Sequence, residues 1–206
     1  MKRFLDVLLS LLAIIFLSPL MLVICLIIIC DDGMPVIFRQ DRVGRGDKLF
    51  KIKKFRTMKN GAPNLSTADF EESDEYITRS GKFLRRTSLD ELPQLFNILK
   101  GEMSFIGPRP ERPQIIREYI EEMPEFAYRT RVKAGLAGYA QVYGKYNTTP
   151  YDKLKLDLFY IENYSVWLDL KLMLLTLKIL FTPDSTEGVD EKQVTAMKKQ
   201  VQEEEK

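Results

Sequence analysis

A long run of apolar residues near the N-terminus constrains the fold of this chain more than any other feature. Residues 7–30 contain no charged side chain, and only Ser10, Ser18 and Pro19 fall outside the hydrophobic set. A straight helix over this run would be about 36 Å long, enough to cross a hydrocarbon core of roughly 30 Å. Length alone therefore predicts a helix within a membrane.

Two features favour a hairpin over a simple crossing. Pro19 lies near the middle of the run, where it removes a backbone hydrogen bond, and the Ser18 hydroxyl can bond back to a carbonyl and help the bend. Each half is then about 18 Å long, too short to span alone. Basic residues flank both ends, with Lys2 and Arg3 before the run and Arg39 after it. Because such flanks stay in the cytoplasm, we predict a re-entrant helix–break–helix, with a spanning helix as the alternative.

The remainder of the chain predicts an α+β fold that is mainly helical. Short strands at residues 35–39 and 49–57, joined by a glycine-containing turn, supply a small β element. Apolar residues recur at helical spacing after residue 80, and the stripe ending at Leu99 is closed by Gly101. Residues 167–181 are apolar but interrupted by charges, so the segment is too short to span a membrane. We expect an amphipathic helix in the membrane interface, with a place in the protein core as the alternative.

Composition narrows the chemistry that is open to the chain. It has no histidine, and both cysteines, Cys25 and Cys30, lie in the apolar run. Histidine-based triads, thiolate nucleophiles and His or Cys zinc sites are thereby excluded from the rest. Lys plus Arg is 31 and Asp plus Glu is 29, a balance that argues against a general nucleic-acid binder. Catalysis would depend on carboxylates, Lys, Arg, Tyr, hydroxyls and a hard metal ion.

A cationic segment follows the apolar run. Basic residues clearly outnumber acidic ones between Arg39 and Lys59. Such a segment suits anionic lipid head groups at a membrane surface, and it equally suits a phosphorylated ligand. Both interpretations remain open, and Lys54 is the candidate for a ligand contact.

The adjacent acids Asp90 and Glu91 are the strongest candidates for catalysis. Ser88 and Glu91 have the spacing of a capping box, which predicts the start of a helix. Acids in a first helical turn are common for structural reasons, and that is the alternative. Arg85 upstream, and Arg109 between two prolines downstream, favour the functional interpretation because arginines bind phosphate.

These residue types together suit phosphoryl transfer. The helix dipole and the arginines would keep Asp90 ionised, as a carboxylate nucleophile requires. Mg²⁺ held by Asp90 or Glu91 and by phosphate oxygens would offset the repulsion between acids and substrate. Attack by Asp90 on phosphorus would form an acyl phosphate and divide the reaction into two half-reactions.

A segment rich in glycine and alanine, residues 135–145, is a weaker candidate. Small residues allow a ligand to approach the backbone closely, Tyr143 could stack on a base, and Gln141 could hydrogen-bond it. The glycine spacing matches neither the dinucleotide fingerprint nor the P-loop, and a buried irregular turn is the structural alternative.

Taken together, these runs resemble the monotopic bacterial phosphoglycosyl transferases, which are polyprenyl-phosphate sugar transferases. The similarity extends from the apolar run to about residue 181. The runs that carry it are Ser18-Pro19, Lys54-Phe55-Arg56-Thr57-Met58, Leu89-Asp90-Glu91-Leu92-Pro93-Gln94, Met103-Ser104-Phe105-Ile106-Gly107-Pro108-Arg109-Pro110, residues 138–144 and Leu168-Asp169-Leu170-Lys171. Lys145 stands where relatives often have arginine, which leaves details of a nucleotide pocket open.

The resemblance implies transfer of sugar-1-phosphate from a UDP-sugar to undecaprenyl phosphate, with release of UMP, at the start of a surface-glycan pathway. It implies Asp90 as nucleophile and Glu91 as its partner near Mg²⁺. Further implied roles are phosphate binding by Lys54, Arg85 and Arg109, and nucleotide binding by Gly138, Gln141, Tyr143 and Lys145. The sugar is expected to be glucose or galactose. A non-catalytic membrane scaffold and a lipid-phosphate hydrolase are the alternatives.

The resemblance also implies an organisation and a location. We expect a membrane-associated re-entrant segment at 1–32, a cytoplasmic catalytic domain on the membrane face at 33–181 and a polar tail at 182–206. The protein would be monotopic in the bacterial inner membrane, with its active site facing the cytoplasm. Expected partners are membrane lipids and downstream glycosyltransferases, with no nucleic acid, and the oligomeric state is left open.

Overall fold

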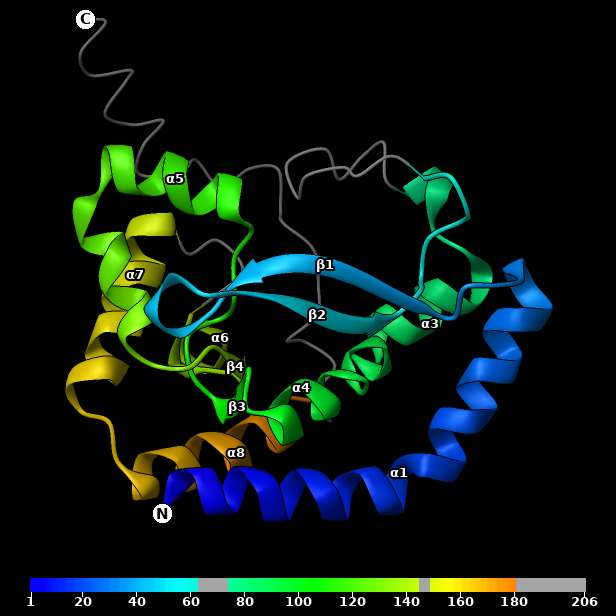
Figure 1. Cartoon of the computed structure of the whole chain (residues 1–206), viewed down its shortest axis with the longest axis horizontal. Coiled ribbons are helices and arrows are strands. Elements are labelled where there is room, and N and C mark those ends of the chain that lie inside the picture. Colours follow the sequence, from blue (N-terminus) through cyan, green and yellow to red (C-terminus); the bar gives the residue numbers. More distant parts are fainter. Residues whose placement is uncertain (63–73, 145–148, 181–206) are drawn as a thin grey trace, which may run out of the picture. The chain divides into compact units, whose positions relative to one another are not determined.

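The fold is mainly helical, as the sequence predicts, and it contains two small strand pairs, of which the sequence predicts only the first (Figure 1). The computed structural model describes residues 1–62, 74–144 and 149–180. The chain forms two compact units, Met1–Arg42 with Phe50–Met103, and Val43–Leu49 with Ser104–Lys206. The predicted boundaries at residues 32 and 181 separate a membrane segment, a catalytic domain and a tail, whereas this division follows contacts within the fold. Those boundaries remain predictions.

The first unit contains the apolar helix, most of a two-stranded hairpin and two short helices. Its elements are α1 (Lys2–Asp32), β1 (Ile37–Val43), β2 (Leu49–Phe55), α3 (Arg79–Arg86) and α4 (Gln94–Lys100), with 3₁₀ turns at Asp74–Tyr76 and Leu89–Glu91. The first strand starts later and runs further than predicted, because the Gly44 amide donates to the Lys48 carbonyl at 2.9 Å and a tight turn lets the strands pair up to that point.

Helix α1 is long and apolar enough to cross a membrane by length and composition. Pro19 lies inside the helix, and the Ser18 hydroxyl donates to the Ile15 carbonyl at 2.8 Å, the back-bond that the sequence predicts. Figure 1 shows that α1 bends partway along its length. The bend has a cause in the sequence, since proline lacks an N–H and its ring crowds the preceding turn.

Both halves of α1 pack against the rest of the first unit. Near its start, Arg3 donates to the carbonyls of Ile98 and Leu99 at 2.6 and 2.7 Å, where α4 ends. In its second half, Ile24 and Ile28 are buried in an apolar cluster with residues of β2 and α3. Other large apolar side chains of α1 are exposed: Phe4, Leu8, Leu11, Leu12, Ile15, Phe16, Leu20, Leu22, Val23, Leu26, Ile27 and Ile29.

The second unit is built around a pair of parallel strands. Its elements are a 3₁₀ turn at Arg45–Asp47, β3 (Ser104–Ile106), α5 (Pro113–Glu122), a 3₁₀ segment at Pro124–Arg131, β4 (Gly135–Ala137), α6 (Tyr139–Tyr143), α7 (Pro150–Glu162) and α8 (Val166–Leu180). Ser104 pairs with Gly135 and Ile106 with Ala137. The irregular turn considered for residues 135–145 is wrong for its first three residues, because this long-range pairing makes Gly135–Ala137 a strand.

Helix α8 carries apolar side chains on its buried side and also on its exposed side. Leu172 is fully buried, in a cluster with Ile106 and Tyr160. Apolar side chains on its other side are exposed: Trp167, Leu170, Leu174 and Leu177. The spacing of the exposed residues places them along one stripe of the helix. Placement of this stripe in a membrane interface remains a prediction.

Candidate active site

Lys54 reaches the acidic pair from strand β2. The two-residue period of a strand places Lys54 on the same face as Phe50 and Ile52, which are buried. Its ammonium lies 2.7 Å from Glu91 Oε1 and 3.8 Å from Asp90 Oδ2. About a fifth of its side chain, 22%, remains exposed, so the cluster is sheltered and still accessible to a ligand.

Asp90 and Glu91 lie in a 3₁₀ turn and not in the capping box that the sequence predicts. Ser88 makes no side-chain cap hydrogen bond and has a left-handed backbone with φ of 55°. Pro93 explains why the α-helix starts only at Gln94, since proline cannot donate the bond that would continue α-helical pairing back into the turn. Leu92 and Pro93 nevertheless have right-handed helical angles, so the turn leads directly into α4.

Leucines on both sides of the acids anchor the turn. Leu89 and Leu92 pack against the apolar cluster that contains Ile24 and Ile28 of α1. The acids between them are turned toward Lys54, and Asp90 is 8% exposed. The position of the acidic pair therefore depends directly on the second half of α1.

Arg85 is held next to the same framework. Its Nε donates to Thr57 Oγ1 at 2.9 Å. Helix α3, which carries Arg85, is capped by Thr78, whose hydroxyl accepts from the Gly81 amide. A Cβ on Gly81 would lie 2.1 Å from the Thr57 carbonyl oxygen, so only glycine lets the helix approach the end of β2 this closely. Sequence reasoning missed Thr57, whose only signal was its place in the run 54–58.

Arg109 lies in the second unit, in an exposed position between the buried prolines 108 and 110. Its carbonyl accepts a hydrogen bond from Arg129 at 2.9 Å, and Arg129 is ion-paired with Asp157 at 2.7 Å. Both members of this pair are buried. Burial raises the pKa of Asp157, against the lowering effect of the Arg129 charge. The pair fixes the backbone of Arg109, and no local sequence pattern connects its members.

Gly138 and Gln141 also lie in the second unit. Gly138 has an extended backbone, and a Cβ there would lie 2.3 Å from the Gly107 carbonyl oxygen. Backbone packing is therefore a sufficient reason for this glycine. The Gln141 side-chain amide is different, since neither its nitrogen nor its oxygen has a hydrogen-bond partner among the described residues, although both are buried. Such an amide costs stability unless a ligand satisfies it.

The other two predicted nucleotide contacts are Tyr143 and Lys145, and the structure describes only the first. Tyr143 is 44% exposed, and its ring packs on Tyr139 with centroids 4.4 Å apart. An exposed ring with a second ring behind it can stack on a base. Lys145 lies outside the described residues.

The donors at the acidic pair suit a hard divalent cation that is shared with a substrate. No group of three or more His, Cys, Asp or Glu side chains in the described part of the chain could hold a metal by itself. Asp90 and Glu91 supply two adjacent carboxylates. Mg²⁺ is commonly held by one or two carboxylates together with substrate phosphates, so these donors fit that ion.

Comparison with known proteins gives a consistent result. The family model described as "Bacterial sugar transferase" matches residues 1–183. The chain is 40% identical over 184 residues to a UDP-N-acetylgalactosamine-undecaprenyl-phosphate N-acetylgalactosaminephosphotransferase of Aeromonas hydrophila, covering 88% of this chain and 44% of that protein.

Two further relatives carry a different sugar in their names. An undecaprenyl-phosphate glucose phosphotransferase of Komagataeibacter xylinus is 41% identical, with 86% of this chain and 35% of the relative covered. A UDP-glucose:undecaprenyl-phosphate glucose-1-phosphate transferase of Caulobacter vibrioides is 39% identical, with 89% and 71% covered. The chain thus spans less than half the length of the first two relatives.

Proposed function

Because the chain belongs to the bacterial sugar transferase family, we propose that it transfers sugar-1-phosphate from a UDP-sugar to undecaprenyl phosphate and releases UMP. The observation that carries this proposal is the acidic pair Asp90–Glu91, sheltered beside Lys54 and packed on α1. The site joins phosphoryl-transfer groups to an apolar helix, as a reaction between a soluble donor and a lipid acceptor requires.

Asp90 is the nucleophile in this proposal. A carboxylate oxygen attacks the β-phosphorus of the UDP-sugar, and the bond from that phosphorus to the bridging oxygen breaks, so UMP leaves with the bridging oxygen. A phosphate oxygen of undecaprenyl phosphate then attacks the same phosphorus. The bond to Asp90 breaks, which restores the carboxylate and yields the lipid diphosphate sugar. Lys54 pairs with both acids and offsets part of their negative charge.

The remaining predicted residues have roles that suit this reaction. Asp90 and Glu91 would hold Mg²⁺, which offsets the negative charge of the phosphates when it is bound. Arg85 and Arg109 bind phosphate oxygens and spread the charge that develops at phosphorus. The amide of Gln141, which has no partner among the described residues, offers N–H donors and a carbonyl acceptor that the edge of a uracil ring can satisfy.

The same unit contacts both ends of α1, and this supports a monotopic arrangement. Arg3 at the start of the helix bonds to the end of α4, and Asp32 at its end bonds to Arg56. A helix that crossed the bilayer would place these ends on opposite sides. We therefore propose a re-entrant α1 in the bacterial inner membrane, with the active site facing the cytoplasm and the exposed stripe of α8 in the interface.

An assay of UMP release tests the proposal. Purified protein in lipid bilayers is given undecaprenyl phosphate, Mg²⁺ and each member of a panel of UDP-sugars. Release of UMP that depends on the lipid acceptor supports the transferase, and the panel identifies the sugar, with glucose and galactose as the expected donors. Sugar phosphate released without the lipid would indicate a hydrolase. If no donor gave UMP, the non-catalytic scaffold would be the remaining interpretation.

A further inference from the structure

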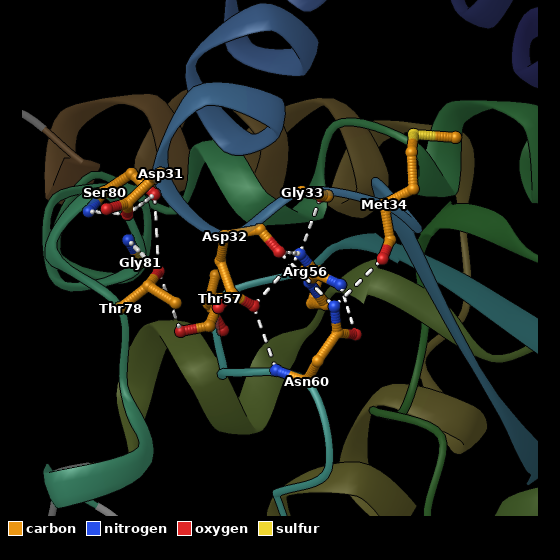
Figure 2. Close-up of polar contacts among 10 residues, drawn as sticks. All are labelled: Asp31, Asp32, Gly33, Met34, Arg56, Thr57, Asn60, Thr78, Ser80 and Gly81. Carbon is orange, nitrogen blue, oxygen red and sulfur yellow. Dashed lines mark hydrogen bonds and ion pairs between the residues drawn. The ribbon is translucent and has the colours of Figure 1, made fainter.

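Helix α1 ends in a way that is unfavourable for an isolated helix. Its last two residues are Asp31 and Asp32, and no basic residue lies in its last turn. The C-terminus of a helix carries partial negative charge and favours cations, so two acids there are destabilising by themselves. Their surroundings must offset this effect, and Figure 2 shows the contacts that do so.

Arg56 binds the end of α1 through several contacts. Its guanidinium donates to the carbonyls of Asp32 and Gly33, both at 2.8 Å, and lies 3.1 Å from the Asp32 carboxylate. The guanidinium also donates to Asn60 Oδ1 at 2.5 Å, and the backbone N–H of Asn60 donates to the Asp32 carboxylate at 2.9 Å. Arg56 is 7% exposed. A planar guanidinium can satisfy these partners at once, which an ammonium cannot.

Asp31 makes the second connection, to helix α3. Its carboxylate accepts from the backbone amide and the hydroxyl of Ser80 at 2.9 and 2.6 Å. Ser80 lies in the first turn of α3, where backbone amides lack partners within the helix. The negative charge of Asp31, at the end of α1, therefore lies at the N-terminus of α3, where the helix dipole is positive (Figure 2).

These contacts lead directly to the catalytic groups. Arg56 lies two residues after Lys54 and immediately before Thr57, whose hydroxyl accepts a hydrogen bond from Arg85. Helix α3 is fixed to the same point, because the Thr78 amide donates to the Thr57 carbonyl at 3.0 Å. The end of α1, the end of β2 and the start of α3 thus form one polar junction, made by Asp31, Asp32, Arg56, Asn60 and Ser80.

We propose that this junction is a positioning device that fixes the height of Asp90 relative to the lipid phosphate. Arg56, Asp31 and Asp32 are positioning residues in it, since they act through α1, β2 and α3. The proposal rests on the proposed function. The donor half-reaction uses a soluble substrate and depends on the contacts among Lys54, Asp90 and Glu91. The acceptor half-reaction also depends on where α1 places those groups in the bilayer.

The test separates the two half-reactions in Arg56→Gln and Asp32→Ala. Exchange of labelled UMP into UDP-sugar, without lipid acceptor, reports the donor step. The KM for undecaprenyl phosphate in bilayer discs reports the acceptor step. We expect exchange within about twofold of wild type and a KM raised at least about tenfold, because small misplacements of reacting groups are costly. Arg56→Lys should recover part of the loss, and the matched control is Asp41→Asn, an exposed acid paired with Lys51.

Equal losses in both steps, or no change in either, would overturn the proposal. Should Arg56→Gln fail to fold, Asp32→Ala decides, since it leaves the backbone contacts of Arg56 in place. Hydrogen exchange gives a readout that is independent of activity: residues 28–34 and 57–60 should lose protection in both variants and keep it in Asp41→Asn. Unchanged protection there would refute the junction. Absence of UMP exchange in the wild type would instead refute the proposed function.

Discussion

Each of the two units contains a sheltered group of opposite charges, three side chains in the first unit and two in the second, and the two groups differ in exposure. In the first unit, the side chains of Lys54, Asp90 and Glu91 are 22%, 12% and 16% exposed. In the second unit, the side chains of Arg129 and Asp157 are 7% and 2% exposed. The first set offers two carboxylates to one lysine at a place that a ligand can reach. The second joins one acid to one arginine, which is also bonded to the Arg109 carbonyl.

The difference in exposure suits two different roles, reaction with a substrate in the first unit and stabilisation of the fold in the second. A charge that takes part in a reaction must meet substrate, so its ion pair stays partly open and can exchange partners. A fully buried pair is expensive to form and more expensive to break, and it fixes the backbone around it. Substitutions at the charges of the first unit should therefore abolish activity and leave the fold intact, whereas substitutions at the buried pair of the second unit should destabilise the fold.

The largest expected effect follows from Asp90→Asn. Activity should fall by at least about 10³-fold, because the amide cannot attack phosphorus. The melting temperature should stay close to that of wild type, since asparagine keeps the volume of the side chain. Steady-state UMP release and thermal unfolding in detergent measure the two quantities. Substantial turnover by this variant would remove Asp90 from the mechanism.

Arg129→Met should give the second largest effect, on stability. The substitution leaves Asp157 as an unpaired buried carboxylate, which is expected to cost about 3–5 kcal/mol of unfolding free energy. Arg131→Met is the matched control, because Arg131 is exposed and lies over the ring of Tyr128 at 4.2 Å. Chemical unfolding of both variants provides the measurement. Equal stability of the two would contradict the architectural role of the buried pair.

Lys54→Met should reduce kcat/KM by about 10²-fold with a small change in stability, as expected for the loss of one preorganised charge next to a reacting phosphate. Lys51→Met provides the comparison on the same strand, since Lys51 is exposed and, within the described part of the chain, its ammonium pairs only with the exposed Asp41. Kinetics with varied UDP-sugar measure the effect. Equal kinetics of the two variants would remove Lys54 from the site.

The smallest effect concerns pH. Hydrogen bonds from Ser80 lower the pKa of Asp31 below its usual value of 3.8. A lowered pKa means that Asp31 stabilises the fold at pH above 3.8, and that this contribution disappears as the pH falls through the folded-state pKa. Asp31→Asn should therefore be less stable than wild type near neutral pH, with a difference that shrinks in acid. A difference that grows on acidification would show the opposite linkage.

Local signals in the sequence predicted much of the fold. The bend in α1 was predicted from Ser18 and Pro19, although the helix continues through the position where a break was predicted. Gly101 ends α4 as predicted, and its backbone there is left-handed. The capping box at Ser88 failed because Pro93 withholds the donor that α-helical pairing needs. Capping signals describe only neighbouring residues, and a proline a few positions on can override them.

Contacts between residues far apart in the chain could not be predicted from the sequence. The Arg129–Asp157 and Arg56–Asp32 pairs join residues that are 28 and 24 positions apart, and no periodicity links their members. The candidate site shows the same limit. Asp90, Glu91 and Lys54 were chosen by residue type and resemblance, whereas the inward face of β2 that brings Lys54 to the acids became visible only in the fold.

The most direct test of the central claim is to look for phospho-sugar on Asp90. Wild-type protein is mixed with a UDP-sugar labelled at the β-phosphate, with Mg²⁺ and without lipid acceptor, then quenched rapidly and analysed by peptide mass spectrometry. We expect label on the peptide that contains Asp90, no label in Asp90→Asn, and loss of the label when undecaprenyl phosphate is added. Rapid product formation by the wild type, with no adduct at any time point, would contradict the claim.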